Sequence, residues 1–135
     1  GNRMEGLKSY IAKHRLLKYE LGKNDCSLFM SRWHDKRYKT NTTKDIEGKY
    51  WDKESAQKYM KEIETITDWL QRMDYREWNE IRDGDFITSQ HEDIVEDGFV
   101  TPFLFLNGLA YTTGKNGLIG IKPSRITKPT VWRAP

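Results

Sequence analysis

The feature that most constrains this chain is a change in hydrophobic spacing near its middle. In the first half, apolar side chains recur three and four residues apart, which is the spacing of one face of an α-helix. In the second half, short apolar and aromatic runs are separated by turns that contain Gly and Asn, which is typical of antiparallel strands. Because the two patterns are segregated along the chain, we predict an α+β fold with N-terminal helices packed on a C-terminal antiparallel sheet.

Three helical segments are expected in the first half. The first spans about Met4 to Leu17, the second opens after an N-cap at Asn24 or Asp25, and the third is capped by Asp52. The third pattern continues through residues 66–73 after a break near position 65. The expected apolar faces are Leu7, Tyr10, Ile11, His14 and Leu17; Cys26, Phe29, Met30 and Trp33; and Ala56, Tyr59, Met60, Ile63, Ile66, Trp69, Leu70 and Met73.

The second half predicts a meander of at least three strands. Asn107-Gly108 suits the positive φ angles of a type I′ turn, so residues 103–106 and 109–112 should form a hairpin. A second turn at 114–117 leads into a strand at 118–121, and the first strand enters at Phe86 and Ile87. Residues 93–100 are ambiguous. The tail at 130–133 is expected to add an edge strand.

Size and composition limit the function. A chain of 135 residues fits one domain, 1–135, in which Gly1 to Arg3 can be read as an expression remnant ahead of a native Met4. The net charge of +3 comes without a basic reader motif, which argues against a nucleic-acid partner. One cysteine excludes an internal disulfide and a multi-cysteine zinc site, and no cluster has metal-ligand spacing, so no metal or cofactor is expected. No apolar run approaches the ~20 residues of a membrane span, and no signal peptide is visible.

Cys26 is the main candidate for chemistry. It follows the N-cap by one or two residues, where the free N–H groups and partial positive charge of a helix start favour a thiolate nucleophile. Cys26 also lies on the apolar face of its helix, and a lone buried cysteine is more often an inert small hydrophobic residue. On spacing alone the inert interpretation is favoured, because no general base is evident beside the thiol.

None of the three histidines is well placed to serve Cys26 as a base. His14 lies on the apolar face of the first helix and is interpreted as a packed core residue. His34 is eight residues beyond Cys26, which is about 12 Å along a helix axis and too far for a hydrogen bond. His91 lies in a polar stretch and is interpreted as a surface loop residue. Asp83 and Asp85 could bind a cation, although a solvated turn is the favoured interpretation.

The segment Leu21 to Phe29, with Asn24-Asp25-Cys26 at its centre, resembles a family motif. It is similar to the Gly-x-Asn/Thr-Asp-Cys segment that opens the nucleophile helix in small phage-tail proteins related to NlpC-type cell-wall peptidases. That family is a branch of the papain-like cysteine peptidases. The resemblance continues, in order, through Glu47-Gly48-Lys49-Tyr50, Gly84-Asp85-Phe86-Ile87, Asn116-Gly117-Leu118 and Trp132-Arg133.

The resemblance implies a papain-like, NlpC-like fold in which Cys26 matches the nucleophile. In the peptidases, the partner histidine opens the strand that follows the Gly-Asp strand. The corresponding stretch here, 99–106, contains no histidine. The thiol would then lack a general base, whose help is worth roughly 100- to 10,000-fold in rate. His91 could substitute only if its loop folds back over the cleft.

Two functions remain open at this point. The resemblance favours a phage-tail-associated domain with a degenerate active site, acting in structure or assembly, whose partners are other tail proteins. The alternative is an active cysteine endopeptidase or amidase, in which Cys26 attacks an amide of a peptidoglycan peptide during phage entry. Either form would be made in the cytoplasm of a bacterial host, with the virion tail as its destination.

Overall fold

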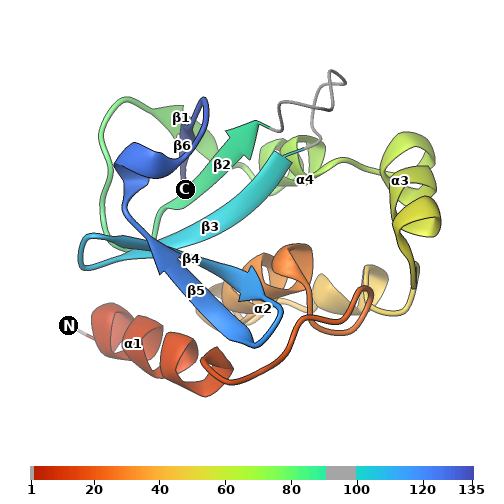
Figure 1. Ribbon diagram of the computed structural model, residues 1–135. Helices are drawn as coiled ribbons and strands as arrows, with labels where there is room; N and C mark the ends of the chain where they lie inside the picture. Colours follow the sequence, from red (N-terminus) through yellow and green to blue (C-terminus); the bar gives the residue numbers. More distant parts are fainter. Residues whose placement is uncertain (1, 91–99) are drawn as a thin grey trace.

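The computed structural model describes residues 2–90 and 100–135, and it places helices in the first half of the chain and a six-stranded antiparallel sheet in the second (Figure 1). The predicted α+β class and the segregation of its elements are confirmed. The helices are α1 (Asn2–His14), α2 (Cys26–Tyr38), α3 (Lys53–Glu62) and α4 (Ile66–Arg72), with single-turn 3-10 helices at Thr43–Asp45 and Pro123–Arg125.

The sheet has the strand order β1-β6-β2-β3-β4-β5, and each neighbouring pair is antiparallel. Its strands are β1 (Arg76–Trp78), β2 (Phe86–Gln90), β3 (Val100–Leu106), β4 (Leu109–Gly114), β5 (Gly117–Ile121) and β6 (Thr130–Arg133). Of the ambiguous stretch 93–100, only its last residue, which opens β3, is among the described residues.

The hairpin between β3 and β4 forms as the sequence predicts. Leu106 pairs with Leu109, and the two residues between them have positive φ angles of 48° at Asn107 and 85° at Gly108. These are the angles of a type I′ turn, whose twist matches the twist of the flanking strands. The second predicted turn joins β4 to β5, where Gly114 pairs with Gly117.

The tail strand β6 is not an edge strand, so that prediction is wrong. Trp132 of β6 faces Glu77 of β1 on one side and Phe86 of β2 on the other. The sequence gives no sign of β1, because its three residues are all exposed and show no alternation. Because β1 is not predicted, β6 is expected to have one neighbour and to form the edge of the sheet. In the structure β1 pairs with β6 and forms that edge instead.

Helix α1 ends three residues earlier than predicted. The N–H of Leu17 donates to the carbonyl of His14 at 3.1 Å, and the carbonyl of Arg15 accepts from Leu118 of β5 at 3.0 Å. Because the backbone of this segment pairs with the sheet, it cannot continue the helix. Leu17 is consequently 46% exposed, and its predicted place on the apolar face is wrong. The predicted face is otherwise buried at Leu7, Tyr10 and Ile11.

The predicted break near Thr65 is confirmed and separates α3 from α4. Thr65 caps α4, since its hydroxyl accepts from the N–H of Asp68 at 3.1 Å. Asp52 caps α3 as predicted and accepts from the N–H of Ser55 at 2.8 Å. Ile63, predicted on the apolar face, follows the end of α3 and is 69% exposed. The chain turns there to start the next helix, so Ile63 no longer faces the core.

The two faces of the sheet are buried differently. The helices cover one face, where sheet residues such as Phe86, Leu104 and Trp132 join the main core. On the other face, Ile87 and its neighbours form a smaller cluster with Ile126, which follows the second 3-10 helix. Strand residues alternate between these two clusters, as expected for a pleated sheet buried on both sides. Among the described residues, no helix has the length and apolarity needed to cross a membrane.

Candidate functional site: the cleft at Cys26

Cys26 is the first residue of α2, and the residue before it fixes where the helix starts. Of the two predicted caps, Asp25 is the one that forms: it has extended backbone angles, and its Oδ1 accepts from the N–H of Leu28 at 3.0 Å. The carboxylate thus satisfies one of the free donors at the helix start. This places Cys26 within the first turn of α2, as the sequence predicts.

The same carboxylate ties two further segments to the helix start. Oδ2 of Asp25 accepts from the N–H of Gly22 at 2.9 Å and from the hydroxyl of Tyr50 at 2.7 Å. Burial, strengthened by the charge of Asp25, raises the pKa of Tyr50 well above its ordinary value. Asp25 is only 2% exposed, and these three donors supply the hydrogen bonds that its buried carboxyl group needs. The loop before α2 and the segment before α3 are therefore held together beside Cys26.

Cys26 lines a cleft of about 310 Å³ between the helix layer and the sheet, here named the Cys26 cleft. This volume is at the small end of the range of ligand pockets. The lining residues come from the segment before α2, from α2 itself, from the segment that leads into α3, from α3 and α4, and from β3 and β4. They are Tyr19, Leu21, Asp25, Cys26, Ser27, Tyr50, Ala56, Met60, Ile66, Val100, Thr101, Thr112 and Thr113.

The thiol of Cys26 is held in its protonated form. Burial, together with the neighbouring Asp25 carboxylate, raises the pKa of Cys26 to about 12. The N–H groups of Ser27 and of Cys26 itself act in the opposite direction, as expected at a helix start, but burial outweighs them. Cys26 as a residue is partly exposed, yet its sulfur is desolvated. At neutral pH this group is therefore a neutral thiol.

The two described histidines are engaged away from the cleft. His14 is half-buried and its Nδ1 lies 2.8 Å from the carbonyl oxygen of Tyr10. His34 is buried, and its Nδ1 lies 2.8 Å from the hydroxyl of Tyr75. Burial lowers the pKa of both rings. Neither is among the residues that line the Cys26 cleft. His91 lies outside the described residues.

Strand β3 belongs to the stretch 99–106, which the resemblance compares with the strand that the histidine opens, and it contributes an apolar residue to the cleft. β3 follows the Gly-Asp strand β2, and it opens at Val100. Val100 lines the Cys26 cleft and also packs against the main core. The side chain of Val100 can neither accept nor donate a proton.

Two threonines of β4 belong to this site and were not singled out from the sequence. Thr112 and Thr113 are buried and line the cleft, and neither hydroxyl has a hydrogen-bond partner among the residues that the structure describes. Tyr19 also lines the cleft, and burial followed by the nearby Cys26 raises its pKa to about 12. The only feature of the sequence that could have indicated these two residues is that they are adjacent threonines at the end of a strand. Threonine is common in strands, so this feature does not mark a site.

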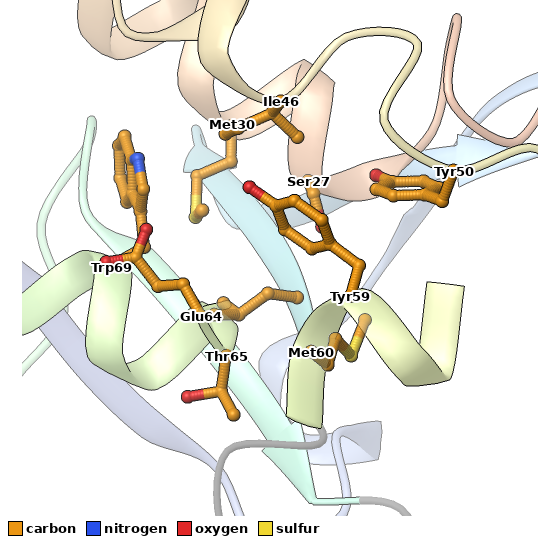
Figure 2. Close-up of a pocket in the computed structure, with 10 residues that line it drawn as sticks. Ser27, Met30, Ile46, Tyr50, Tyr59, Met60, Glu64, Thr65 and Trp69 are labelled. Carbon is orange, nitrogen blue, oxygen red and sulfur yellow. The ribbon is translucent and has the colours of Figure 1, made fainter. Parts of the chain in front are cut away.

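A second, smaller cavity adjoins the cleft (Figure 2) and shares four lining residues with it, Ser27, Tyr50, Met60 and Ile66. In Figure 2 the side chains of Tyr59 from α3 and Trp69 from α4 stand on either side of it, with Met30 of α2 above. Its volume of about 20 Å³ holds roughly one water molecule. The larger Cys26 cleft is therefore the one with room for a ligand.

The acidic residues considered for a cation are used within the fold. Asp85 accepts two hydrogen bonds from Arg133, and Asp83 accepts from the N–H of Asn107 at 2.7 Å. In the described part of the chain, no group of three His, Cys, Asp or Glu side chains is arranged to hold a metal ion.

Comparison with known proteins gives one match. The model of the family described as a domain of unknown function, DUF6950, matches residues 2–133. No curated protein matches the chain, and no solved structure does.

Proposed function

Because the chain belongs to the DUF6950 family, whose description assigns no function, we propose from its own site that it is a non-catalytic NlpC-like domain associated with phage tails. In this role it acts in tail structure or assembly, and its partners are other tail proteins. The papain-like arrangement is part of the proposal. Its support is that the cysteine helix α2 packs on β3 and β4 of an antiparallel sheet.

One observation carries the non-catalytic assignment: among the described residues, Cys26 shares its cleft with Val100 and with no histidine. A cysteine nucleophile needs a neighbouring group that takes its proton or lowers its pKa. Here burial and Asp25 raise the pKa of Cys26 to about 12, so the reactive thiolate is a very small fraction at neutral pH. A cleft of this kind retains the shape of an active site without its acid–base chemistry.

The test measures hydrolysis and assembly separately. Purified protein is incubated with peptidoglycan and with soluble cell-wall peptides, and the release of new amino groups is compared with that of the Cys26→Ser variant. We expect no difference between the two. In a phage that requires this chain, Cys26→Ser should restore infectious particles to the wild-type titre. Loss of infectivity with a correctly folded Cys26→Ser protein would contradict the structural role.

The second candidate is an active cysteine endopeptidase or amidase acting on peptidoglycan. Its support is the position of Cys26 at a helix start, with the N–H groups of Ser27 and Cys26 directed at the sulfur. Such donors can stabilise the oxyanion of an acyl transfer. This candidate requires His91 as the base. It predicts that Cys26→Ser and His91→Ala abolish hydrolysis equally, whereas the structural candidate predicts no hydrolysis to abolish.

A further inference from the structure

The described wall of the Cys26 cleft offers no free charge to a ligand. Among the residues that the structure describes, Asp25 is the only charged one that lines the cleft, and both of its carboxylate oxygens already accept hydrogen bonds from Gly22, Leu28 and Tyr50. An anionic ligand would meet this buried negative charge at close range. A cationic ligand would lose its hydration, and the carboxylate oxygens of Asp25 that could replace the lost water are already hydrogen-bonded. The cleft therefore selects for uncharged groups.

Much of the remaining wall is apolar. Side chains from four different parts of the chain contribute to it, so the apolar surface surrounds the cleft instead of forming a single stripe. These side chains are Leu21, Ala56, Met60, Ile66 and Val100. Burying an apolar group against such a wall is favourable in proportion to the area removed from water.

The wall also carries hydroxyl groups that can donate, and those of Thr112 and Thr113 have no acceptor among the described residues. Thr113 shares a face of β4 with Tyr111 and pairs with Leu118 of β5, and both of these neighbours pack against the core under the helices. Strand alternation therefore directs Thr113 toward the helix layer that carries Cys26. Thr113 is 9% exposed, and its hydroxyl has no hydrogen-bond partner in the described part of the chain. A buried hydroxyl left without a partner is destabilising, and a ligand oxygen would relieve this.

We propose that the Cys26 cleft binds, without covalent chemistry, an uncharged apolar amino-acid side chain together with the carbonyl group of its peptide unit. The apolar wall takes the side chain, and the hydroxyl of Thr113 and the N–H groups at the start of α2 face the carbonyl oxygen. This deepens the proposed function and rests on it in one respect, that the cleft is not catalytic. It identifies the partner chemistry as a neutral, apolar peptide segment, which is unlike a charged cell-wall peptide.

The test is an NMR titration of the ¹⁵N-labelled full chain with three small probes. N-acetyl-leucine N-methylamide is neutral and apolar, while the glutamate and lysine analogues carry one charge each. We expect saturable shifts with the leucine probe at the amides of Cys26, Ser27 and Thr113. The two charged probes should bind at least tenfold more weakly, because the wall offers them no free counter-charge.

Two variants and one control identify the contacts. Thr113→Val keeps the shape and removes the hydroxyl, so binding of the leucine probe should weaken about 3- to 10-fold, the usual effect of one neutral hydrogen bond. Ala56→Leu fills the cleft and should abolish the shifts, with the rest of the spectrum reporting that the fold is intact. Thr127→Val, at an exposed threonine outside the cleft, should leave the affinity unchanged.

Three results would overturn the inference: charged probes that bind as tightly as the leucine probe, shifts confined to residues outside the cleft, or a Thr113→Val affinity equal to that of Thr127→Val. These results differ from those that overturn the proposed function. Hydrolysis of cell-wall peptides by the wild type but not by Cys26→Ser would refute the non-catalytic role, whether or not the leucine probe binds. Absence of both hydrolysis and binding would refute only the present inference.

Discussion

Arg133 and Asp85 form a bidentate ion pair that joins β6 to the residue immediately before β2. Nε of Arg133 donates to Oδ1 of Asp85 at 3.0 Å, and a terminal nitrogen donates to Oδ2 at 2.8 Å. The guanidinium also lies 4.4 Å from the centre of the Trp78 ring, which belongs to β1. Through this one side chain, three neighbouring strands are held in register.

Removing Arg133 should destabilise the fold strongly. The Asp85 side chain is 5% exposed, so Arg133→Ala would leave a buried carboxylate without its main partner. We expect a loss of about 3 kcal/mol in the free energy of unfolding, at the lower end of the range for broken buried pairs because Arg133 retains some exposure. Arg133→Lys should recover only part of this, since an ammonium cannot reproduce the fork. Urea unfolding measures both, and a loss below 0.5 kcal/mol for Arg133→Ala would refute the role of the pair.

Gly22 and Gly48 provide a matched pair of glycines with positive φ. Both have φ near +80°, but a Cβ at Gly22 would lie 1.9 Å from the carbonyl oxygen of Tyr50, whereas a Cβ at Gly48 meets open space. Gly48→Ala should therefore cost only the left-handed backbone penalty of about 1–2 kcal/mol.

Gly22→Ala should cost clearly more than Gly48→Ala, because it also forces Tyr50 away from Asp25. Thermal unfolding of the two variants in parallel isolates the steric contribution. Equal losses of stability would mean that the loop before α2 can relax without disturbing the site.

Asp35 should make the fold sensitive to acid. Burial opposes its ionisation, but hydrogen bonds from Thr43, Thr40 and Thr42 outweigh this and hold the pKa of Asp35 well below its usual range. A carboxyl whose pKa is lowered by folding contributes stability above its unfolded pKa of about 3.9, and this contribution is lost as the pH falls through the folded pKa.

The wild type should therefore lose more stability between pH 6 and pH 2 than Asp35→Asn does. At pH 6, Asp35→Asn should be less stable by about 1.5–3 kcal/mol, the usual effect of hydrogen bonds to a charged group. Glu62→Gln, at an exposed carboxylate on α3, is the control. It should change neither the stability at pH 6 nor the loss of stability between pH 6 and pH 2 appreciably. Parallel pH profiles for the wild type and Asp35→Asn would show that Asp35 does not carry the effect.

The reactivity of Cys26 should follow its raised pKa. Alkylation by iodoacetamide in the folded protein should be slow at pH 7 and should rise about tenfold per pH unit up to pH 10 without levelling off. The urea-unfolded protein should instead titrate near the ~8.5 of a free thiol. A plateau below pH 8 in the folded state would mean an activated thiolate and would favour the peptidase candidate.

Val100→His extends the same measurement to the geometry of the cleft. If β3 presents this position to the thiol, the new imidazole should lower the apparent pKa of Cys26 and speed its alkylation at pH 7 at least tenfold. A histidine that leaves the rate unchanged would show that residue 100 does not face the sulfur.

The helices could be predicted from the sequence because their signals are local. Three predicted features form in the structure, and each depends only on residues within about four positions of one another. They are the cap at Asp25, the break at Thr65 and the Asn107-Gly108 turn. The failures are contacts between distant segments. Leu17 leaves the helix because Arg15 pairs with β5, a partner about a hundred residues away.

The site was predictable only on its cysteine side. Cys26 and its cap lie together in the sequence, so their relation can be read directly. Thr113 reaches the cleft only because the sheet folds back against α2, and Tyr50 bonds to Asp25 although the two are 25 positions apart in the sequence. Periodicity shows which face of a strand is buried, but not which of its residues meets which helix.

The position of β6 has a consequence for the order in which the fold is completed during synthesis. β2 leaves the ribosome about forty residues before its neighbour β6, which corresponds to about 2 to 8 s of elongation. Throughout that interval one side of β2 has unpaired backbone groups that could bind another chain. The nascent chain is therefore most vulnerable to aggregation in the interval between the synthesis of β2 and the insertion of β6 into the sheet.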